Sequence, residues 1–339
     1  MRRIPRRRRA LLAAGLSLAG VAPAPPWHRR LQAAEPAYPE RPVSLIAPFS
    51  AGGAADIAAR ILAAHAPQHL PNPGGTIVVE NRTGASGAVG TQFVARARPD
   101  GYTLLLARVG SSAILPATDP RTPYAWDEFT MLGLLDVNPF VVCVRADAPW
   151  RSFAELIATL RENPGRLNFA TTGPATILDL GIRHVFAAMG LPIDAAIALP
   201  FRGGGEAVAA LLSGQVQFIG NNLTDTSAAI ASGGLRALVV GTIERLPTLP
   251  EVPSAREAGI ESLARIVGWN ALFGPPALAE PATRAWVAAL AALARDPEWL
   301  GATQRVGGIP RVLDPEATRE FVREQVALYR DLARRLGLI

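Results

Sequence analysis

Small residues interrupt the chain where an apolar segment gives way to an amphipathic helix pattern. The segment 43–47 reads VSLIA, and Ser50, Ala51, Gly52 and Gly53 precede the helix pattern. A helix N-terminus carries unpaired amide N–H groups and a partial positive charge. Because glycine lets a ligand come close to that backbone, the pattern predicts an anion-binding loop. The alternative is that these glycines only make a tight turn.

Similar loops of small and polar residues recur in both halves of the sequence. In open parallel sheets, ligands bind beyond the carboxyl ends of the strands, where such loops gather. The repetition therefore favours a shared cleft over a set of independent turns. The loops lie at residues 50–53, 83–90, 109–112, 171–176, 202–205 and 221–226.

Continuous apolar runs separate these loops and predict β-strands. Runs without polar alternation are typical of parallel strands that are covered on both faces. Ser152 and Glu155 form a capping box before a helix, and apolar residues at helical spacing predict a final helix over about 315–336. Alternating strands and helices predict an α/β fold. The predicted strands are 43–47, 76–80, 102–107, 141–145, 167–170, 197–201, 216–220, 235–240 and 268–276.

The strand–helix alternation restarts near residue 140, which predicts two α/β lobes. We assign residues 38–139 and 264–339 to the first lobe and residues 140–263 to the second. No low-complexity linker separates them. Extended strands are therefore expected to cross between the lobes.

The basic charge of the chain is concentrated at its N-terminus. The chain has 34 arginines and no lysine, and residues 1–34 contain arginines but no aspartate or glutamate. An arginine-rich segment followed by the apolar run 10–24 predicts a signal peptide over residues 1–34, exported by the Tat or the Sec route. A nucleic-acid-binding arm is the alternative. The absence of lysine excludes a Schiff base and a P-loop lysine.

Other reactive side chains are few, and they form no recognisable catalytic set. His65 and His69 are spaced like metal ligands, but Pro67 lies between them and no HExxH motif is present. Cys143 lies in an apolar strand and is expected to fill the core. Trp269 adjoins a predicted crossing strand and is a weaker candidate for the cleft. We therefore expect no metal, no cofactor and no enzyme activity.

Several motifs, in order along the chain, carry a family resemblance. They include PFSAGGAADIAAR, VVENRTGASGAVGTQFVARARPDGYTLLL and LPFRGGGEAVAALLSGQVQFIGNN, and the match continues through WNALFGPP. The chain from Tyr38 onward resembles the substrate-binding proteins of tripartite tricarboxylate transporters, the Bug family. The resemblance implies a two-lobed periplasmic binding protein of type II, with parallel and mixed sheets flanked by helices and a Venus-flytrap cleft. It also implies a small carboxylate-bearing ligand and membrane permease subunits as partners.

The resemblance also implies which residues line the cleft. One jaw is expected from the loops after the first strands of the first lobe, and the other from corresponding loops of the second lobe. Asp56 follows the glycine pair, where it either caps the loop or contacts ligand. The implied residues are Ser50, Ala51, Gly52, Gly53, Asp56, Gly84, Ala85, Ser86, Gly87, Arg108, Gly110, Ser111, Thr171, Thr172, Gly173, Thr176, Asp179, Phe201, Arg202, Gly203 and Asn221.

Departures from the family pattern concentrate in the second jaw. Asp179 stands where the family usually has histidine, Phe201-Arg202 replaces a common Tyr-Lys pair, and Asn221 replaces a common aspartate. In the first jaw, Arg108 replaces a small polar residue. Arg108 and Arg202 could each hold a carboxylate through two hydrogen bonds, or each could be a solvated surface arginine.

The expected function is capture of a small organic acid in the periplasm by hinge closure, with the protein acting as a monomer. Two alternatives remain open. A sensor would use the same cleft to report ligand to a signalling protein, and an enzyme of similar fold would need catalytic groups that the sequence does not show.

Overall fold

The computed structural model describes residues 38–73, 75–174 and 176–339. The chain divides into two units, Met1–Pro36 and Ala37–Ile339, and only the second is described below. The predicted signal peptide over residues 1–34 lies outside the described residues. Among the described residues, no helix is long and apolar enough to cross a membrane.

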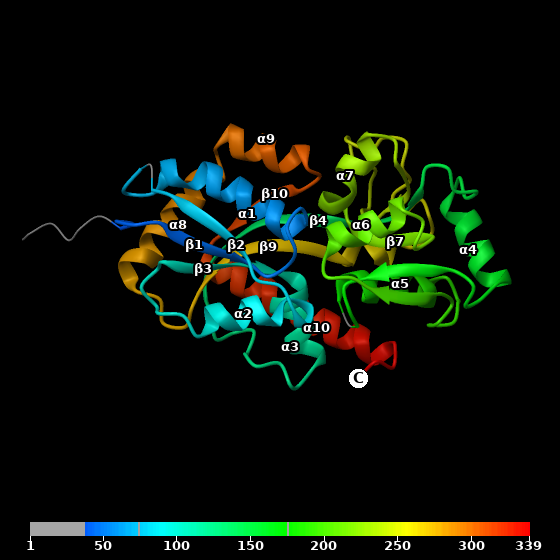
Figure 1. The fold of residues 1–339 in the computed structure, drawn as a ribbon, viewed down its shortest axis with the longest axis horizontal. Helices are drawn as coiled ribbons and strands as arrows, with labels where there is room; N and C mark the ends of the chain where they lie inside the picture. Colours follow the sequence, from blue (N-terminus) through cyan, green and yellow to red (C-terminus); the bar gives the residue numbers. More distant parts are fainter. Residues whose placement is uncertain (1–37, 74, 175) are drawn as a thin grey trace, which may run out of the picture. The chain divides into compact units, whose positions relative to one another are not determined.

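The first lobe is built on three parallel strands that continue into an antiparallel region (Figure 1). β1 lies between β2 and β3, and β9 pairs with β3 in the antiparallel direction. A fifth strand, β10, pairs with β4 (Thr130–Arg145). The strands are β1 (Val43–Ala47), β2 (Ile77–Asn81), β3 (Thr103–Arg108), β9 (Val267–Gly274) and β10 (Ile309–Leu313).

Helices cover both faces of this sheet. Leu45, Leu104 and Leu106 pack in one apolar layer with residues of α1, α8 and α9. Ile46 and Leu105 point the other way, into a layer shared with α2, α3 and α10. Alternate side chains of β1 and of β3 thus point into opposite apolar layers. Both faces of these strands are buried, which explains why their sequences are continuously apolar. These helices are α1 (Ala54–His65), α2 (Ala88–Ala95), α3 (Leu115–Thr118), α8 (Glu280–Leu293), α9 (Pro297–Arg305) and α10 (Pro315–Arg335).

The second lobe repeats the pattern. β5 pairs in parallel with both β6 and β7, and β7 and β8 each pair with β4 in the antiparallel direction. Its strands are β5 (Asn168–Thr171), β6 (Ile197–Pro200), β7 (Phe218–Asn222) and β8 (Leu235–Val240), and its helices are α4 (Phe153–Glu162), α5 (Ile177–Ala188), α6 (Gly204–Leu212) and α7 (Leu223–Ala231).

One long strand joins the two lobes. β4 (Thr130–Arg145) pairs with β9 from Thr130 to Pro139 and with β7 and β8 from Phe140 onward. Figure 1 shows β4 and β9 running between the two groups of elements. The prediction of crossing strands is confirmed. The predicted strand 141–145, however, was only the last part of β4.

Shorter helical segments complete the connections. They are η2 (Ala66–His69), η3 (Ala85–Gly87), the π-helical η4 (Gly110–Ile114) and η5 (Glu261–Arg265). The Ser152 hydroxyl accepts a hydrogen bond from the Glu155 N–H at 3.2 Å, which confirms the predicted cap of α4. In a capping box the Glu155 carboxylate would accept from the Ser152 N–H. Here it accepts from the N–H of Arg151, one residue earlier, at 2.6 Å.

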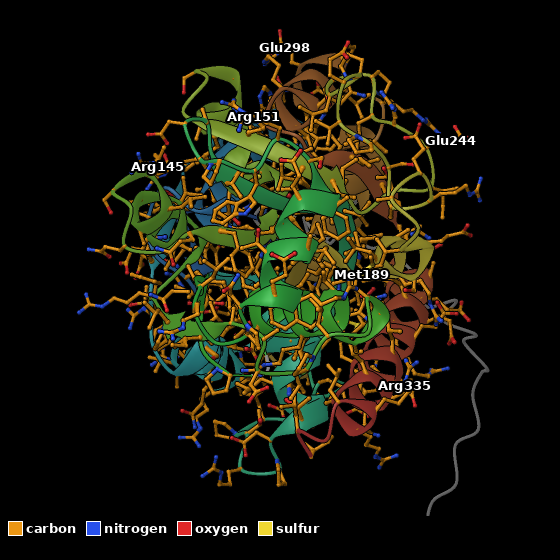
Figure 2. The ribbon with its side chains drawn as sticks, turned by 90° about the vertical axis from the view of Figure 1, so that its right-hand side faces the viewer. Arg145, Arg151, Met189, Glu244, Glu298 and Arg335 are labelled. Atoms are coloured by element: carbon orange, nitrogen blue, oxygen red, sulfur yellow. The ribbon has the colours of Figure 1, made fainter. Side chains whose placement is uncertain are left out.

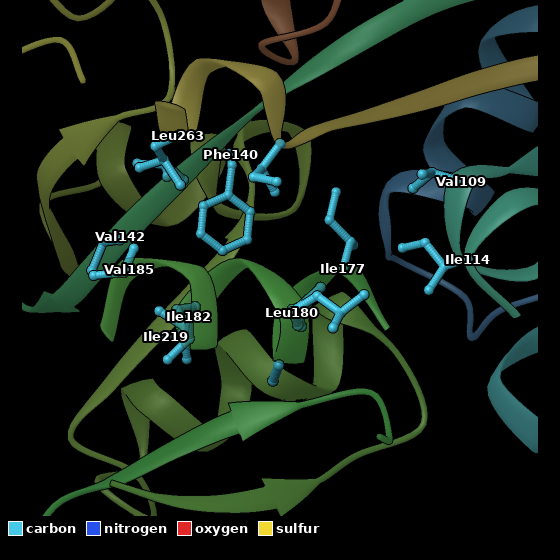
Figure 3. Close-up of a cluster of buried hydrophobic side chains, with 14 of the residues drawn as sticks. Val109, Ile114, Phe140, Val142, Ile177, Leu180, Ile182, Val185, Ile219 and Leu263 are labelled. Carbon is cyan, nitrogen blue, oxygen red and sulfur yellow. The ribbon is translucent and has the colours of Figure 1, made fainter. Parts of the chain in front are cut away.

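The core of the second lobe is packed around Phe140, where β4 enters it (Figure 3). A β-carbon added at Gly181 of α5 would lie 2.4 Å from the Phe140 ring, and one at Gly220 of β7 would lie 2.3 Å from it. Both glycines are therefore needed for this close approach. Cys143 is fully buried, as predicted, and burial raises the pKa of its thiol to about 12.

Charged side chains project from the surface around the described chain (Figure 2). Many are paired with neighbours, as Arg145 is with Asp147 and Arg335 is with Asp331. Exposed pairs of this kind add little to stability. Arg108, in contrast to these exposed arginines, is buried.

Candidate functional site

A cavity opens where loops from the two lobes meet. Its volume is about 30 Å³, and about 420 Å³ of space is free of atoms when the opening to solvent is counted. Its walls come from the starts of α1, α5, α6 and α7 and from the end of β3. The lining residues are Phe49, Gly53, Ala54, Ala55, Arg108, Val109, Gly110, Thr172, Thr176, Ile177, Leu178, Gly204, Asn222 and Asp225.

The loop before α1 has a conformation that requires glycine. Gly52 has a φ of +77°, a region that other residues rarely adopt. Its N–H donates to Asp56 Oδ2 at 3.0 Å, and Arg60 Nε donates to the same oxygen at 2.9 Å. Burial raises the pKa of Asp56, but the hydrogen bonds from Arg60, Gly52 and Asn81 lower it more, so it lies below its usual value. Asp56 caps its own loop and does not line the cavity.

The start of α6 lies directly against this loop. A β-carbon at Gly203 would lie 2.3 Å from Ser50 Oγ, and one at Gly205 would lie 3.3 Å from the Gly52 carbonyl oxygen. The Ser50 hydroxyl is buried and has no hydrogen-bond partner among the described residues. Two helix N-termini, one from each lobe, therefore lie close together at glycines that carry no side chains. Such an arrangement concentrates positive potential at one place.

A carboxylate of the second lobe lies between these helix starts. Asp225, in the first turn of α7, accepts a hydrogen bond from the Ala54 N–H of α1 at 2.6 Å. Its other oxygen accepts from Asn222 Nδ2 at 3.1 Å. A β-carbon at Gly204 of α6 would lie 2.4 Å from the Asp225 Cγ. Burial raises the pKa of Asp225, and Arg108, the Ala54 N–H and Asn222 offset part of that rise.

Arg108 brings a buried cation to the cavity wall. Only 5% of the residue is exposed, and Nη1 donates to Asn270 Oδ1 at 2.7 Å. Asn270 Nδ2 in turn donates to Asp136 Oδ1 at 2.7 Å. Burial lowers the pKa of Arg108, while the carboxylates of Asp225 and Asp136 raise it. The guanidinium is thus anchored by Asn270, and Arg108 is among the residues that line the cavity.

Asp136 supports Arg108 from behind the cavity. Burial raises its pKa to about 6, although hydrogen bonds from Asn270 and Asn138 and the charge of Arg108 act in the opposite direction. Asn138 also accepts a hydrogen bond from Thr224 Oγ1. This chain of buried polar groups links β3, β9, β4 and α7. It fixes the position of the guanidinium relative to both lobes.

The predicted loop 84–87 lies beside the cavity rather than in its wall. Gly84, Ala85, Ser86 and Gly87 all have positive φ angles, of 130°, 46°, 54° and 91°. Two of them are not glycine, so the loop is strained. A β-carbon at Gly173 of the second lobe would lie 2.8 Å from Ser86 Oγ. The loop therefore contacts the opposite lobe at the cavity rim.

Hydroxyl groups of the second lobe hold the loop before α5. Thr171 Oγ1 and Thr176 Oγ1 both donate to the Gly173 carbonyl, at 2.9 and 2.8 Å. Thr172 and Thr176 line the cavity, as Gly110 does from the first lobe. Ser111 is fully buried and its hydroxyl has no partner among the described residues, while its carbonyl accepts from Tyr124 at 2.7 Å.

Four other predicted residues of the second lobe do not line the cavity. Asp179 accepts a hydrogen bond from Arg183 Nε at 2.8 Å. Arg202 is exposed, and its N–H donates to Glu206 at 3.0 Å. Phe201 lies partly buried against the core. Asn221 donates to the Gly204 carbonyl at 3.1 Å and so helps to hold the start of α6.

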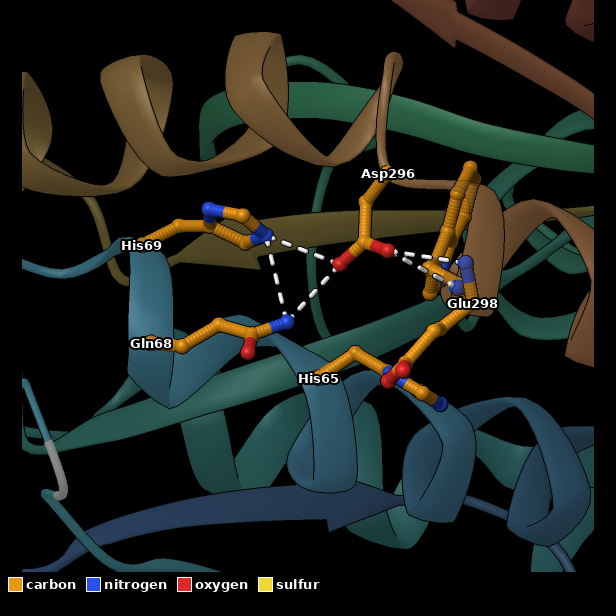
Figure 4. A network of polar contacts seen from close by, with 6 residues as sticks. His65, Gln68, His69, Asp296 and Glu298 are labelled. Atoms are coloured by element: carbon orange, nitrogen blue, oxygen red, sulfur yellow. Dashed lines mark hydrogen bonds and ion pairs between the residues drawn. The ribbon is translucent and has the colours of Figure 1, made fainter.

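His69, one of the two histidines spaced like metal ligands, has a structural role (Figure 4). His69 Nε2 lies 2.9 Å from Asp296 Oδ2, which also accepts from Gln68 Nε2 at 2.8 Å. Asp296 caps α9 through the N–H of Glu298. Within the described ranges, no group of three or more histidine, cysteine, aspartate or glutamate side chains could hold a metal ion. Trp269 is fully buried in β9 and does not line the cavity.

Several lining residues were missing from the sequence prediction. Most are neighbours of predicted ones, and the apolar Phe49, Val109, Ile177 and Leu178 flank the loops that were singled out. Asp225 lies at the end of the predicted loop 221–226, but an acid in the first turn of a helix is common for reasons unrelated to ligand. Nothing in the sequence indicates that it reaches the start of α1.

The chain is similar in sequence and in structure to known periplasmic binding proteins. Residues 58–338 match the family described as tripartite tricarboxylate transporter family receptor. The periplasmic binding protein BugD is similar with a TM-score of 0.81 and 32% identity, over 89% of this chain and 99% of BugD. MatC (Rpa3494) from Rhodopseudomonas palustris with bound malate is similar with a TM-score of 0.79 and 27% identity, over 87% of this chain and 99% of MatC. Rpa4515 from R. palustris with adipate is similar with a TM-score of 0.82 and 25% identity, over 88% of this chain and 98% of Rpa4515. The predicted fold of a two-lobed periplasmic binding protein is confirmed.

Proposed function

Because the chain belongs to the tripartite tricarboxylate transporter receptor family, as its resemblance to the Bug proteins predicted, we propose that it captures a small carboxylate for transport. Its place of action is the periplasm, and its partners are the membrane permease subunits of a tripartite transporter. It acts as a monomer, and the binding cycle makes and breaks no covalent bond. Malate in MatC and adipate in Rpa4515 support a carboxylate as the ligand class.

The observation that carries the proposal is Arg108. This residue is only 5% exposed and lines a cavity between two lobes, and its guanidinium is held by Asn270, so it is suited to bind a carboxylate through two hydrogen bonds. Thr172 and Thr176 add hydroxyl groups on the opposite wall. Phe49 and Ile177 add apolar surface for the carbon skeleton of the ligand.

Binding is coupled to closure of the lobes. Residues 38–139 and 264–339 move as one body against residues 140–263, about a hinge where β4 and β9 cross. A ligand that contacts both lobes favours the closed form by its differential affinity for that form. The contacts of Gly203 with Ser50 and of Gly205 with Gly52 exist only when the lobes are together. The permease subunits recognise the closed form.

A thermal-shift panel of the purified protein tests the proposal. It contains mono-, di- and tricarboxylates, aromatic acids, amino acids, the matching amides and neutral sugars. A ligand at a hundredfold excess over its Kd should add about 2.7 kcal/mol to the free energy of unfolding. At least one acid is expected to raise the melting temperature and its amide is not. Stabilisation by sugars while every acid fails would contradict the proposal.

A further inference from the structure

We propose that Asp225 is a specificity-determining residue that supplies one carboxylate of the site from the protein itself, so that the cavity selects ligands with a single carboxylate over dicarboxylates. The inference rests on the proposed function and narrows its ligand class. In the favoured ligand, the carboxylate binds Arg108. A neutral or positively charged hydrogen-bond donor of the same ligand lies beside Asp225.

The position of Asp225 is that of a bound anion. Its carboxylate lies against the start of α1, through the Ala54 N–H at 2.6 Å, and against the start of α6, at Gly204. A small anion would be expected at this junction in the absence of Asp225, because two helix N-termini converge there. The second hydrogen bond, from Asn222 at 3.1 Å, holds the carboxylate in place.

The hydrogen bonds of Asp225 also show which lobe supplies the anion. Asp225 belongs to α7 of the second lobe, whereas Ala54 belongs to α1 of the first. The hydrogen bond between them is a direct contact between the lobes. A ligand carboxylate that took the same N–H would have to displace Asp225 and deprive its charge of that hydrogen bond.

The charges around the cavity favour a single ligand carboxylate. Among the described residues that line the cavity, Arg108 is the one cation and Asp225 is the one acid. Asp136 adds a second acid behind Arg108, through Asn270. One ligand carboxylate at Arg108 already brings the negative charges of this group to three against one positive charge. A second carboxylate would lie near Asp225 and add a fourth, so repulsion between like charges disfavours a dicarboxylate.

Asp225 also offers a partner for a donor group. It lines the cavity, and each of its oxygens can accept more than the one hydrogen bond that the structure gives it. Asn222 lines the cavity beside it, but its Oδ1 atom lies against Gly268 of β9. An amide or ammonium group of a ligand could donate to Asp225. This pairing distinguishes the site from one built for malate or adipate, each of which carries two carboxylates.

Matched probes of two lengths test the inference by calorimetric titration. The short set is succinate, succinamate and γ-aminobutyrate, and the long set is adipate, adipamate and ε-aminocaproate. In each set, only the group opposite the shared carboxylate changes. On the unmodified protein, the monocarboxylate of the better-fitting length is expected to bind about tenfold or more tightly than its dicarboxylate.

The variant Asp225→Asn removes the charge and keeps an acceptor for the Ala54 N–H. It is expected to shift the ratio of affinities about tenfold towards the dicarboxylate. Glu206→Gln is the matched control, because Glu206 is a carboxylate of the first turn of α6 that accepts from Arg202 and does not line the cavity. It should keep the ratio of the unmodified protein. The probe comparison on the unmodified protein holds even if Asp225→Asn does not fold.

The outcomes separate this inference from the proposed function. If the dicarboxylates bind the unmodified protein as tightly as their monocarboxylate partners, or if a folded Asp225→Asn keeps the original ratio, the inference is overturned and the proposed function stands. If no acid of either set or of the wider panel binds either protein, the proposed function fails, and the inference fails with it.

Discussion

Replacement of Gly53 by valine should block closure of the lobes without unfolding the protein. Gly53 precedes α1 with a φ of −89° and a ψ of 172°, a conformation that valine adopts readily. A β-carbon there would lie 3.3 Å from Asp225 Oδ1 and 3.5 Å from the Gly205 nitrogen, both in the second lobe. The first added carbon therefore just fits when the lobes are closed.

The γ-carbons of valine decide the size of the effect. They extend about 1.5 Å beyond the β-carbon, so at least one must enter the space of Asp225, Gly205 or the Ser50 carbonyl, which is also 3.5 Å from the added β-carbon. Overpacking of this kind costs about 1–3 kcal/mol. The open form avoids the clash, so the cost falls on binding and raises Kd by about 5- to 150-fold.

Calorimetric titration with the best acid of the thermal-shift panel measures this loss. Gly53→Ala is the matched control, because both variants lose glycine at the helix cap, at a cost of up to about 1 kcal/mol of stability, while only valine carries γ-carbons. Small-angle scattering should show contraction on ligand addition for Gly53→Ala and little for Gly53→Val. Unchanged affinity in a folded Gly53→Val protein would refute the assignment of this loop to the closing interface.

Three further substitutions test separate parts of the structure. Arg108→Gln should weaken carboxylate binding by about 100-fold or more in titrations, and near-normal affinity would remove Arg108 from the site. Asp56→Ala should lower unfolding free energy by about 1 kcal/mol with affinity changed by less than about threefold, since Asp56 caps its own loop; a large affinity loss would show direct ligand contact. Asp296→Ala should cost about 1–2 kcal/mol in denaturant unfolding at neutral pH. The hydrogen bond from His69 lowers the pKa of Asp296, so its contribution is complete above the unfolded pKa and is lost as the pH falls through the lower folded pKa. The difference from the unmodified protein should therefore shrink below about pH 4, and a constant difference would contradict the role of this charge.

Much of the fold could be predicted because its strands are buried on both faces. The predicted ranges 43–47 and 235–240 coincide with β1 and β8, and most of the others differ from the structure by one or two residues at their ends. The final helix, predicted over 315–336, is α10, Pro315–Arg335. Long apolar runs and helical spacing depend on burial alone, which a single sequence records well.

The first part of β4 and the whole of β10 were not predicted. The residues from Thr130 to Pro139 include Gly133, two polar residues, Asp136 and Asn138, and a proline, none of which is typical of a central strand. The polar residues are buried because they hold Arg108 through the network described above. Their hydrogen-bond partners on other elements, Asn270 of β9 and Thr224 of α7, are far from them in sequence, so their burial could not be predicted from spacing.

The candidate site was predicted in outline from its loops. Gly53, Gly110 and Thr176 line the cavity, and the two glycine-rich helix starts do meet. The sequence left open whether Arg108 or Arg202 was a surface residue, and the structure buries the first and exposes the second. That difference depends on the partner Asn270, which no local pattern reveals.

A crystal structure with the tightest-binding acid of the panel would test the central claim most directly. We predict that the ligand lies between the lobes with a carboxylate oxygen within hydrogen-bond distance of the Arg108 guanidinium and with the Asp225 carboxylate still at the Ala54 N–H. A ligand bound on one lobe alone, or between the lobes with no contact to Arg108, would contradict the account.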